Sequence, residues 1–323
     1  MPVRFYSKEL FALKILLLLI LFAATSFAQA KELPEQRAAI TGTEVSLIPP
    51  VGFTPSPQFP GYWEESLGAS IQVTEFPAPY SITFAALSDT AQLTKRGISL
   101  LSRREVSVGR LKGMLLQVRQ SASGLEYLKW ILNFGDEEES VSIVATFPKG
   151  LEKELSEKLK RSILTATWEK ERNIPPTEGL DFTIVDKGEM ILAKRVANVL
   201  IYTKDGMLPK LSNDEPLFVA GSSVSKINVE ERENFAKSRI AQTATITDIG
   251  IEQSENITID NLAGYEVVAK GKDIVSGQEM VIYQTILFKD QGYYIMVGLI
   301  SSTHRQVYLP VFKGMTESFK RNK

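Results

Sequence analysis

The sequence predicts an α+β protein made of two similar α-β-α sandwich domains, each a mainly antiparallel sheet with helices packed on it. The first observation is an internal repeat, because most of residues 106–147 recur with changes at residues 257–299. The second is that each copy holds three strand-like runs separated by turn residues. The third is that apolar residues recur every three or four positions after each copy, which is the spacing of a helix that buries one face.

Landmark residues align the two copies. The Ser-Gly pairs of the two copies supply the positive-φ residue that a tight hairpin turn needs. Each copy therefore predicts a meander of antiparallel strands. The alignment pairs Leu111 and Gly113 with Leu262 and Gly264, Ser123-Gly124 with Ser276-Gly277, and Phe134 with Phe288.

A helix is expected to close each meander. In the first copy Leu151, Leu155, Leu159 and Ile163 form the apolar stripe. In the second copy the stripe is formed by Tyr308, Val311, Phe312, Met315 and Phe319. One-sided stripes of this kind pack a helix against a sheet.

Further elements are expected before each meander. The first copy predicts strands at 45–48 and 69–76 and a helix at 82–96, with Phe84, Ala85, Leu87 and Ala91 available for its inner face. The second copy predicts short strands at 182–185, 189–193, 199–202 and 217–220, a charged helix at 229–240 and a strand at 246–259.

A proline-rich stretch with Pro55, Pro57 and Pro60 predicts a loop that reaches Tyr62 and Trp63. For these two aromatic residues we favour a hydrophobic plug over the end of the sheet. A ligand-stacking role is the alternative.

The N-terminus has the layout of a secretory signal peptide. Three basic residues precede an apolar core at 15–24, and Ala28-Gln29-Ala30 offers a small-x-small cleavage site. The apolar core is short for an uncleaved membrane anchor, which is the alternative. We therefore expect a cleaved signal peptide at 1–30, a leader at 31–40, a first domain at 41–172, a linker at 173–178 and a second domain at 179–323.

Composition limits the classes of function. With 44% apolar and 23% charged residues, the 323-residue chain is globular and long enough for two ordinary cores. A formal net charge of −1 gives no basis for nucleic-acid binding as the main activity. The chain has no cysteine and one histidine, so disulfides are excluded and zinc, copper or iron sites are not expected.

Few residues suggest chemistry. His304 reads as a surface histidine, because no G-x-S-x-G nucleophile motif accompanies it. Ser223-Val-Ser-Lys226 matches an S-x-x-K pattern but lacks the companion motifs of serine acyl-enzymes. Asp136 to Glu139 could offer oxygen ligands to calcium or manganese, although a solvated turn is the favoured interpretation. No catalytic, cofactor-binding or metal-ligating residue is therefore assigned, and no cofactor is expected.

The order of elements resembles the PsbP-like superfamily. The resemblance rests on an early strand ending in Pro49-Pro50-x-Gly52-Phe53, a helix, a meander with L-x-G, and a closing helix ending in Ser318-Phe319. It covers roughly residues 41–168 and 179–321. It implies an α-β-α sandwich, and members of this superfamily mostly act by docking to other proteins. No functional residue can be carried over.

These observations favour a non-enzymatic, exported binding protein that docks through its PsbP-like domains on a protein complex in the envelope or at a membrane surface. The expected location is the periplasm or the extracellular space, or the thylakoid lumen if the host is photosynthetic. The alternative is a periplasmic carrier of a small ligand, bound between the domains or on a sheet face rich in tyrosine, namely Tyr265, Tyr283, Tyr293 and Tyr294. A hydrolase that works through carboxylates is a third hypothesis.

Overall fold

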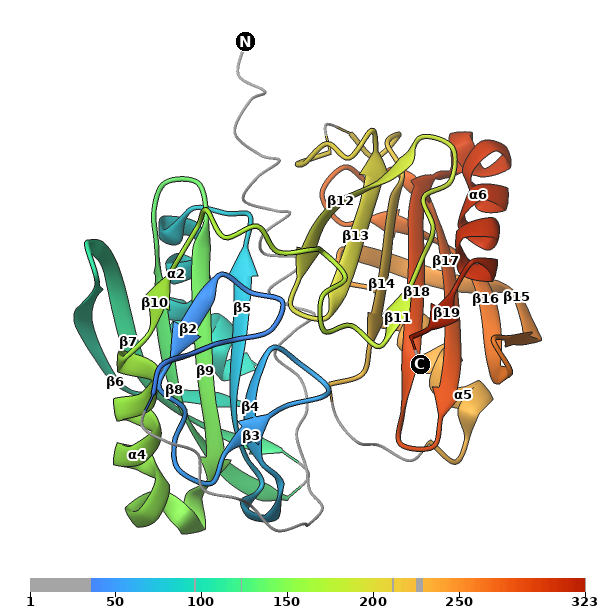
Figure 1. The fold of residues 1–323 in the computed structure, drawn as a ribbon. Coiled ribbons are helices and arrows are strands. Elements are labelled where there is room, and N and C mark those ends of the chain that lie inside the picture. Colours follow the sequence, from blue (N-terminus) through green and yellow to red (C-terminus); the bar gives the residue numbers. More distant parts are fainter. Residues whose placement is uncertain (1–35, 96, 123, 211, 225–228, 323) are drawn as a thin grey trace. The chain divides into compact units, whose positions relative to one another are not determined.

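The computed structural model describes residues 36–323 except 96, 123, 211, 225–228 and 323. The predicted signal peptide and the first half of the predicted leader lie outside the described residues. The chain forms two compact units, one ending at Gly179 and one spanning Leu180–Lys323 (Figure 1). We call them the N-terminal unit and the C-terminal unit, and each is described by itself. The boundaries 41–172 and 179–323 stay a prediction.

A seven-stranded antiparallel sheet is the centre of the N-terminal unit. Its strand order is β3-β4-β5-β9-β8-β7-β6, so the consecutive strands β6 to β9 form the predicted meander. The strands are β3 (Thr54–Pro55), β4 (Gly61–Glu64), β5 (Ala69–Phe76), β6 (Ile98–Val108), β7 (Leu111–Ala122), β8 (Leu125–Gly135) and β9 (Ser140–Pro148).

Helices cover both faces of this sheet. Helix α4 (Glu152–Leu164) follows the 3-10 turn η2 (Lys149–Leu151) and buries Leu155, Leu159 and Ile163 completely, as the spacing predicted. Each such burial stabilises the fold by about 1.5–3 kcal/mol. Helices α2 (Tyr80–Ser88) and α3 (Thr90–Lys95) pack on the opposite face. A small sheet of β1 (Ala38–Ala39), β2 (Val45–Leu47) and β10 (Thr167–Trp168) adds side chains to the core under α4.

The C-terminal unit is built on a second seven-stranded antiparallel sheet, with the order β12-β13-β14-β18-β17-β16-β15. The consecutive strands β15 to β18 form its meander. The strands are β12 (Met190–Val196), β13 (Val199–Lys204), β14 (Leu217–Ser222), β15 (Ile246–Ile259), β16 (Leu262–Asp273), β17 (Glu279–Lys289) and β18 (Gly292–Ser301).

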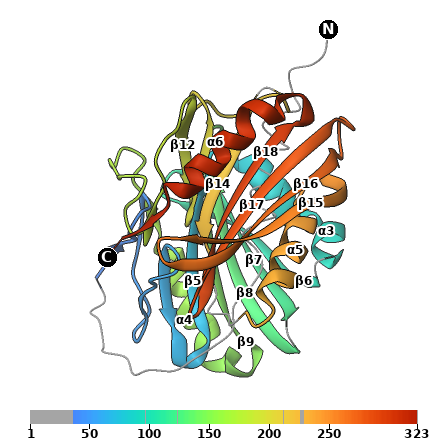
Figure 2. The same cartoon turned by 90° about the vertical axis from the view of Figure 1, so that its right-hand side faces the viewer.

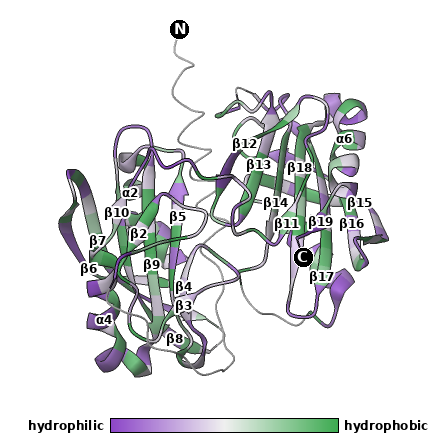
Figure 3. Cartoon of the chain, in the orientation of Figure 1, coloured by the Kyte–Doolittle hydropathy of each residue, from purple (hydrophilic) through white to green (hydrophobic). Residues whose placement is uncertain are grey.

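Helix α6 (Arg305–Glu317), preceded by the 3-10 turn η3 (Ser302–His304), lies across one face of this sheet, and α5 (Arg232–Ala241) covers part of the other (Figure 2). The helices carry hydrophilic as well as hydrophobic residues, as expected for elements with one buried face (Figure 3). Short strands β11 (Phe182–Thr183) and β19 (Lys320–Arg321) pair the start of the unit with its end.

The strand and helix order of one unit repeats that of the other. Strands β3 to β9 correspond to β12 to β18, α4 corresponds to α6, and the helices on the opposite face, α2 with α3 and α5, correspond as well. Both sheets are antiparallel throughout. The predicted α+β class with two similar α-β-α domains is confirmed.

The duplication extends to an irregularity on the edge strands. Strand β6 has a register shift between Leu100 and Ser102, and β15 has one between Ile251 and Gln253. Both shifts fall at the same position when the meander glycines Gly113 and Gly264 are aligned. A bulge that is kept in both copies is a structural feature of the unit.

The alignment of Phe134 with Phe288 was wrong by one residue. Gly113 lies opposite Phe134, whereas Gly264 lies opposite Leu287. Phe134 and Leu287 belong to the cores under α4 and α6, but Phe288 belongs to the core under α5. A shift of one residue along a strand reverses the face of the sheet.

The single helix predicted at 82–96 is instead two short helices that meet at Asp89. Leu87 and Leu93 are buried, whereas Ala85 and Ala91 of the predicted inner face are exposed. Because the helix is interrupted at Asp89, the residues that face the sheet in α3 do not continue the helical spacing of those in α2.

The loop predicted around Pro55 and Pro60 contains a short hairpin, in which β3 pairs with β4. Tyr62 is buried in the core under α4, and its strand neighbour Trp63 lies on the opposite face of the sheet. The two rings therefore do not form a common stacking surface. Tyr62 fills the core, in partial agreement with the predicted plug.

Small residues let the long helices approach the sheets. Gly298 on β18 lies under α6, where an added Cβ would come within 2.3 Å of the Phe312 ring. The equivalent position in the N-terminal unit is Ala145, which is fully buried in the core under α4.

We expect Gly298→Ala to lower the free energy of unfolding by about 1–3 kcal/mol, because the added methyl group overpacks the interface with Phe312. Urea denaturation with matched m-values measures the change. Gly250→Ala is the control, since nothing lies within 4 Å of a Cβ added there. Equal stability of both variants would contradict this account of α6 packing.

Candidate functional site

A charged cluster ties the turn between β8 and β9 to the end of the N-terminal unit. The Lys170 ammonium lies 2.7 Å from Asp136 Oδ2 and 3.6 Å from Glu139 Oε2. Asp136 Oδ1 accepts hydrogen bonds from the backbone N–H groups of Glu138 and Glu139. The carboxylates that were considered as cation ligands therefore contact a lysine side chain, and Asp136 orders its own turn. No group of three or more metal-ligating side chains occurs within the described residues.

The pKa of Asp136 is lowered to about 2. Burial acts in the opposite direction and is the largest single contribution. The hydrogen bond to Lys170, the two backbone N–H groups and the charge of Lys170 together outweigh it. The carboxylate is therefore ionised at neutral pH and stabilises the folded state there.

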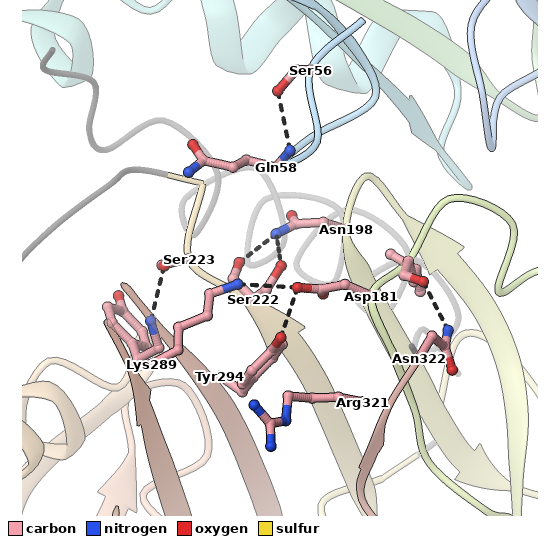
Figure 4. Close-up of polar contacts among 12 residues, drawn as sticks. Ser56, Gln58, Asp181, Asn198, Ser222, Ser223, Lys289, Tyr294, Arg321 and Asn322 are labelled. Atoms are coloured by element: carbon pink, nitrogen blue, oxygen red, sulfur yellow. Dashed lines mark hydrogen bonds and ion pairs between the residues drawn. The ribbon is translucent and has the colours of Figure 1, made fainter. Parts of the chain in front are cut away.

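The C-terminal unit has a related cluster where its first and last segments meet (Figure 4). Asp181 Oδ2 accepts hydrogen bonds from Tyr294 Oη at 2.7 Å and Lys289 Nζ at 3.1 Å. Lys289 also lies over the Tyr294 ring, 4.4 Å from its centroid. Nearby, Arg321 Nε is 2.7 Å from Asp260 Oδ2. These contacts fasten the chain ends of this unit to the meander.

A buried polar network lies under α6 in the C-terminal unit, and the described residues of the N-terminal unit do not repeat it at the equivalent positions. Glu266 on β16 accepts a hydrogen bond from Tyr283 Oη at 2.9 Å and pairs with Lys313 of α6. Thr285 donates to Tyr283 Oη at 2.9 Å. Burial, and then the Glu266 charge, raise the pKa of Tyr283. The register places Leu115 at the equivalent position of Glu266.

The N-terminal unit fills the same space with a different arrangement. Trp130, equivalent to Tyr283, donates from Nε1 to Ser156 Oγ at 3.0 Å, and Lys160 Nζ lies 5.2 Å from the centroid of a Trp130 ring. A lysine of the long helix therefore contacts the central aromatic residue directly in this unit. In the C-terminal unit the Glu266 carboxylate lies between Lys313 and Tyr283 and contacts both.

His304 does not form a catalytic triad. Its Nδ1 lies 3.1 Å from Ser301 Oγ and 3.5 Å from Asp214 Oδ1. A triad needs the serine and the carboxylate on different ring nitrogens, whereas both contacts here use the same one. The histidine lies in η3 with a side chain that is 43% exposed, in agreement with a surface position.

The other candidates from the sequence do not converge. Ser225 and Lys226 of the S-x-x-K pattern lie outside the described residues, and Ser223 accepts a hydrogen bond from the Tyr293 backbone N–H. The four tyrosines divide between the two faces of the sheet. Tyr283 and Tyr294 are buried under α6, and Tyr265 and Tyr293 are half-buried on the α5 face.

Lys129 was not singled out by the sequence. It lies half-buried on β8 between Val118 and Thr146, on the face that α2 and α3 cover in part. Burial lowers its pKa to about 8. The available signal was its position inside an apolar run that is buried on both faces of the sheet.

The edge strands β6 and β15 are the long exposed elements of the two sheets. Each is the last strand of its sheet and pairs on one side only. Residues 101–105 of β6 are all exposed, and the bulged Leu101 is 48% exposed. An edge strand presents unpaired backbone N–H and C=O groups, which another extended segment can pair with.

Comparisons with known proteins find similar solved structures and no similar sequence. No protein-family model and no curated protein sequence matches this chain. Among solved structures, cyanobacterial PsbP from Synechocystis is 10% identical, with 44% of this chain and 82% of that chain covered and a TM-score of 0.27. LpqN of Mycobacterium tuberculosis, involved in cell envelope biogenesis, is 10% identical, with 44% and 83% covered and a TM-score of 0.31.

A third similar structure covers both units. The immunity protein TplEi of the type VI secretion system (T6SS) from Pseudomonas aeruginosa is 10% identical, with 88% of this chain and 96% of that chain covered and a TM-score of 0.30. The chain thus has a modest PsbP-like resemblance, as the sequence predicted. These TM-scores transfer no role to this chain. Within the described residues, no helix is long and apolar enough to cross a membrane.

We expect Asp136→Asn to lower the free energy of unfolding by about 0.5–2 kcal/mol at pH 7, because a charge-assisted pair and a turn are weakened. The folded-state pKa lies below the ordinary value, so this contribution is present above pH 4 and is lost as pH falls through about 2. Chemical denaturation at both pH values tests this. Glu137→Gln on the same exposed turn is the control, and a pH-independent difference would contradict the assignment.

We expect Lys313→Met to destabilise the C-terminal unit by about 1–3 kcal/mol, since it leaves the Glu266 carboxylate buried without its ammonium partner. The double variant Glu266→Leu/Lys313→Met should recover most of that loss, because leucine already occupies the equivalent position 115. A double-mutant cycle measured by urea denaturation gives the coupling. Additive effects of the two substitutions would refute the network.

Proposed function

We propose that this protein is an exported, non-catalytic binding protein that docks on a protein partner in the envelope or at a membrane surface. The observation that carries the proposal is a contrast within the described residues. The carboxylates of Asp136, Asp181 and Glu266 already form hydrogen bonds or ion pairs with lysine, tyrosine or backbone donors of the same unit. The exposed edge strands, in contrast, keep backbone groups available for a partner.

Export is supported by the N-terminal sequence, where basic residues, a short apolar core and a small-x-small site follow one another. Absence of cysteine fits a chain that depends on its cores for stability in any compartment. Non-catalytic action is supported by the contacts of His304, since Ser301 and Asp214 both lie near its Nδ1 and do not occupy different ring nitrogens.

Affinity capture after crosslinking in the native host tests the proposal, with the chain tagged at its C-terminus and expressed with its own N-terminal sequence. We expect a defined protein partner in the envelope fraction, recovered in constant proportion over replicate captures. A tagged, unrelated exported protein is the control. Recovery of the bait alone, with turnover of ester or glycoside substrates by the pure protein, would overturn the proposal.

A further inference from the structure

The equivalent edge hairpins of the two units carry opposite charge. Residues 98–112, which form β6 and its turn into β7, hold four basic residues and one acidic residue. The equivalent residues 249–263 hold three acidic residues and no basic one. The basic residues are Arg103, Arg104, Arg110 and Lys112, and the acidic residues of the second hairpin are Glu252, Glu255 and Asp260.

The acidic hairpin is largely neutralised within its own unit. Glu252 pairs with Arg305 and lies 2.8 Å from Lys270 Nζ. Asp260 pairs with Arg321 at 2.7 Å. The turn residues Asp260 and Asn261 hold the positive φ angles of a tight hairpin. Two of the three acidic residues of this hairpin are therefore paired with cations of the same unit.

The basic hairpin is not neutralised in this way. Arg103, Arg104, Arg110 and Lys112 are exposed, and none forms an ion pair with another of the described residues. The ion pairs of this part of the sheet lie further along, where Arg119 and Lys149 meet Glu126. Four cations on one hairpin are therefore available to a partner.

The basic side chains are placed on both sides of the edge strand. Arg103 lies opposite Leu116, which packs in the core under α2 and α3, and Arg104 lies opposite Leu115, which packs in the core under α4. The two guanidinium groups thus belong to opposite faces of the sheet. A flat membrane surface would meet one face only, whereas an extended segment paired to β6 would place side chains on both.

We propose that β6 binds an acidic, extended segment of a partner protein by strand addition, an inference that rests on the proposed function and names the docking surface. The segment pairs with the free edge of β6 through backbone hydrogen bonds. Its carboxylates, alternating between the two faces, meet Arg103 on one side and Arg104 on the other. The bulge at Leu101 interrupts the regular ladder of β6 and offers an apolar contact beside the site.

Charges on an edge strand also prevent self-association, and the basic residues of β6 repel a second copy of β6. Pairing of β6 with the acidic β15 of a second copy is opposed by the ion pairs that already hold Glu252 and Asp260. A separate acidic segment is not repelled by the basic residues of β6, and its carboxylates are not already paired.

The test uses residues 31–323 and a fluorescent ten-residue peptide in which pairs of glutamates alternate with pairs of threonines, so that the extended peptide carries carboxylates on both of its faces. We expect saturable binding in fluorescence anisotropy that weakens with salt. Arg103→Glu/Arg104→Glu should weaken binding about tenfold or more at about 50 mM salt, because two attractions become repulsions. Lys153→Glu/Arg161→Glu on α4, with the same change in net charge, should stay within about twofold.

Two control peptides separate charge from strand addition. A threonine–lysine peptide should not bind, and a threonine–glutamate peptide with alternate backbone N-methyl groups should lose most of its affinity. Equal binding of the N-methylated peptide, or equal loss in both protein variants, would overturn the proposal. So would binding to vesicles of anionic phospholipid without peptide binding, or concentration-dependent dimerisation that the β6 variant abolishes. Circular dichroism confirms that the variants are folded.

Affinity capture with the same variants separates this inference from the proposed function. Loss of the partner with Arg103→Glu/Arg104→Glu, and its retention with Lys153→Glu/Arg161→Glu, supports both. Equal recovery with both variants would keep the binding function and reject β6 as its surface. Failure to recover a partner with the unaltered chain would count against the proposed function itself.

Discussion

Packing of one long helix on the middle of each sheet is the constraint on which both units depend. Helices α4 and α6 can approach the central strands because Ala145 and Gly298 occupy the strand positions beneath them. The aromatic residues Trp130 and Tyr283 then lie beside these small residues on the neighbouring strand. The repeat in the sequence preserves this packing, and the remaining positions are free to differ between the copies.

The copies have diverged in two places that matter for function. Under the helix, leucine at 115 became a buried carboxylate at 266, or the reverse, and lysine and tyrosine partners accompany the carboxylate. At the sheet edge, the exposed hairpin is basic in one unit and acidic in the other. At the first place, Glu266 is paired with side chains of its own unit. At the second place, the basic side chains of the β6 hairpin stay exposed. For this reason we place the binding surface at the edge.

The sequence predicts the architecture well where hydrophobic periodicity determines it. The meanders, the closing helices at 152–164 and 305–317, and the two-unit α+β class follow from apolar spacing and Ser-Gly turns. Prediction from the sequence fails where the register of a strand decides on which face of the sheet a residue lies. Phe288 resembles Phe134 by type but lies on the other face, because Leu287 is the residue that pairs with Gly264, the equivalent of Gly113. The break at Asp89 and the β3–β4 hairpin are likewise set by tertiary contacts.

The candidate site was less accessible to sequence reasoning. The carboxylates at 136–139 suggested a cation, but the cation that the fold supplies is Lys170, which lies more than thirty residues further along the chain. The basic character of residues 98–112 is visible in the sequence. Its meaning appears only when β6 is known to be an edge and β15 is known to be its equivalent.

Hydrogen–deuterium exchange of residues 31–323, free and in complex with the captured partner, tests the central claim most directly. The account predicts slower exchange over residues 98–108 in the complex, because the outward backbone amides of β6 become hydrogen-bonded, with little change over residues 246–259. Unchanged exchange at β6 together with protection elsewhere would contradict it.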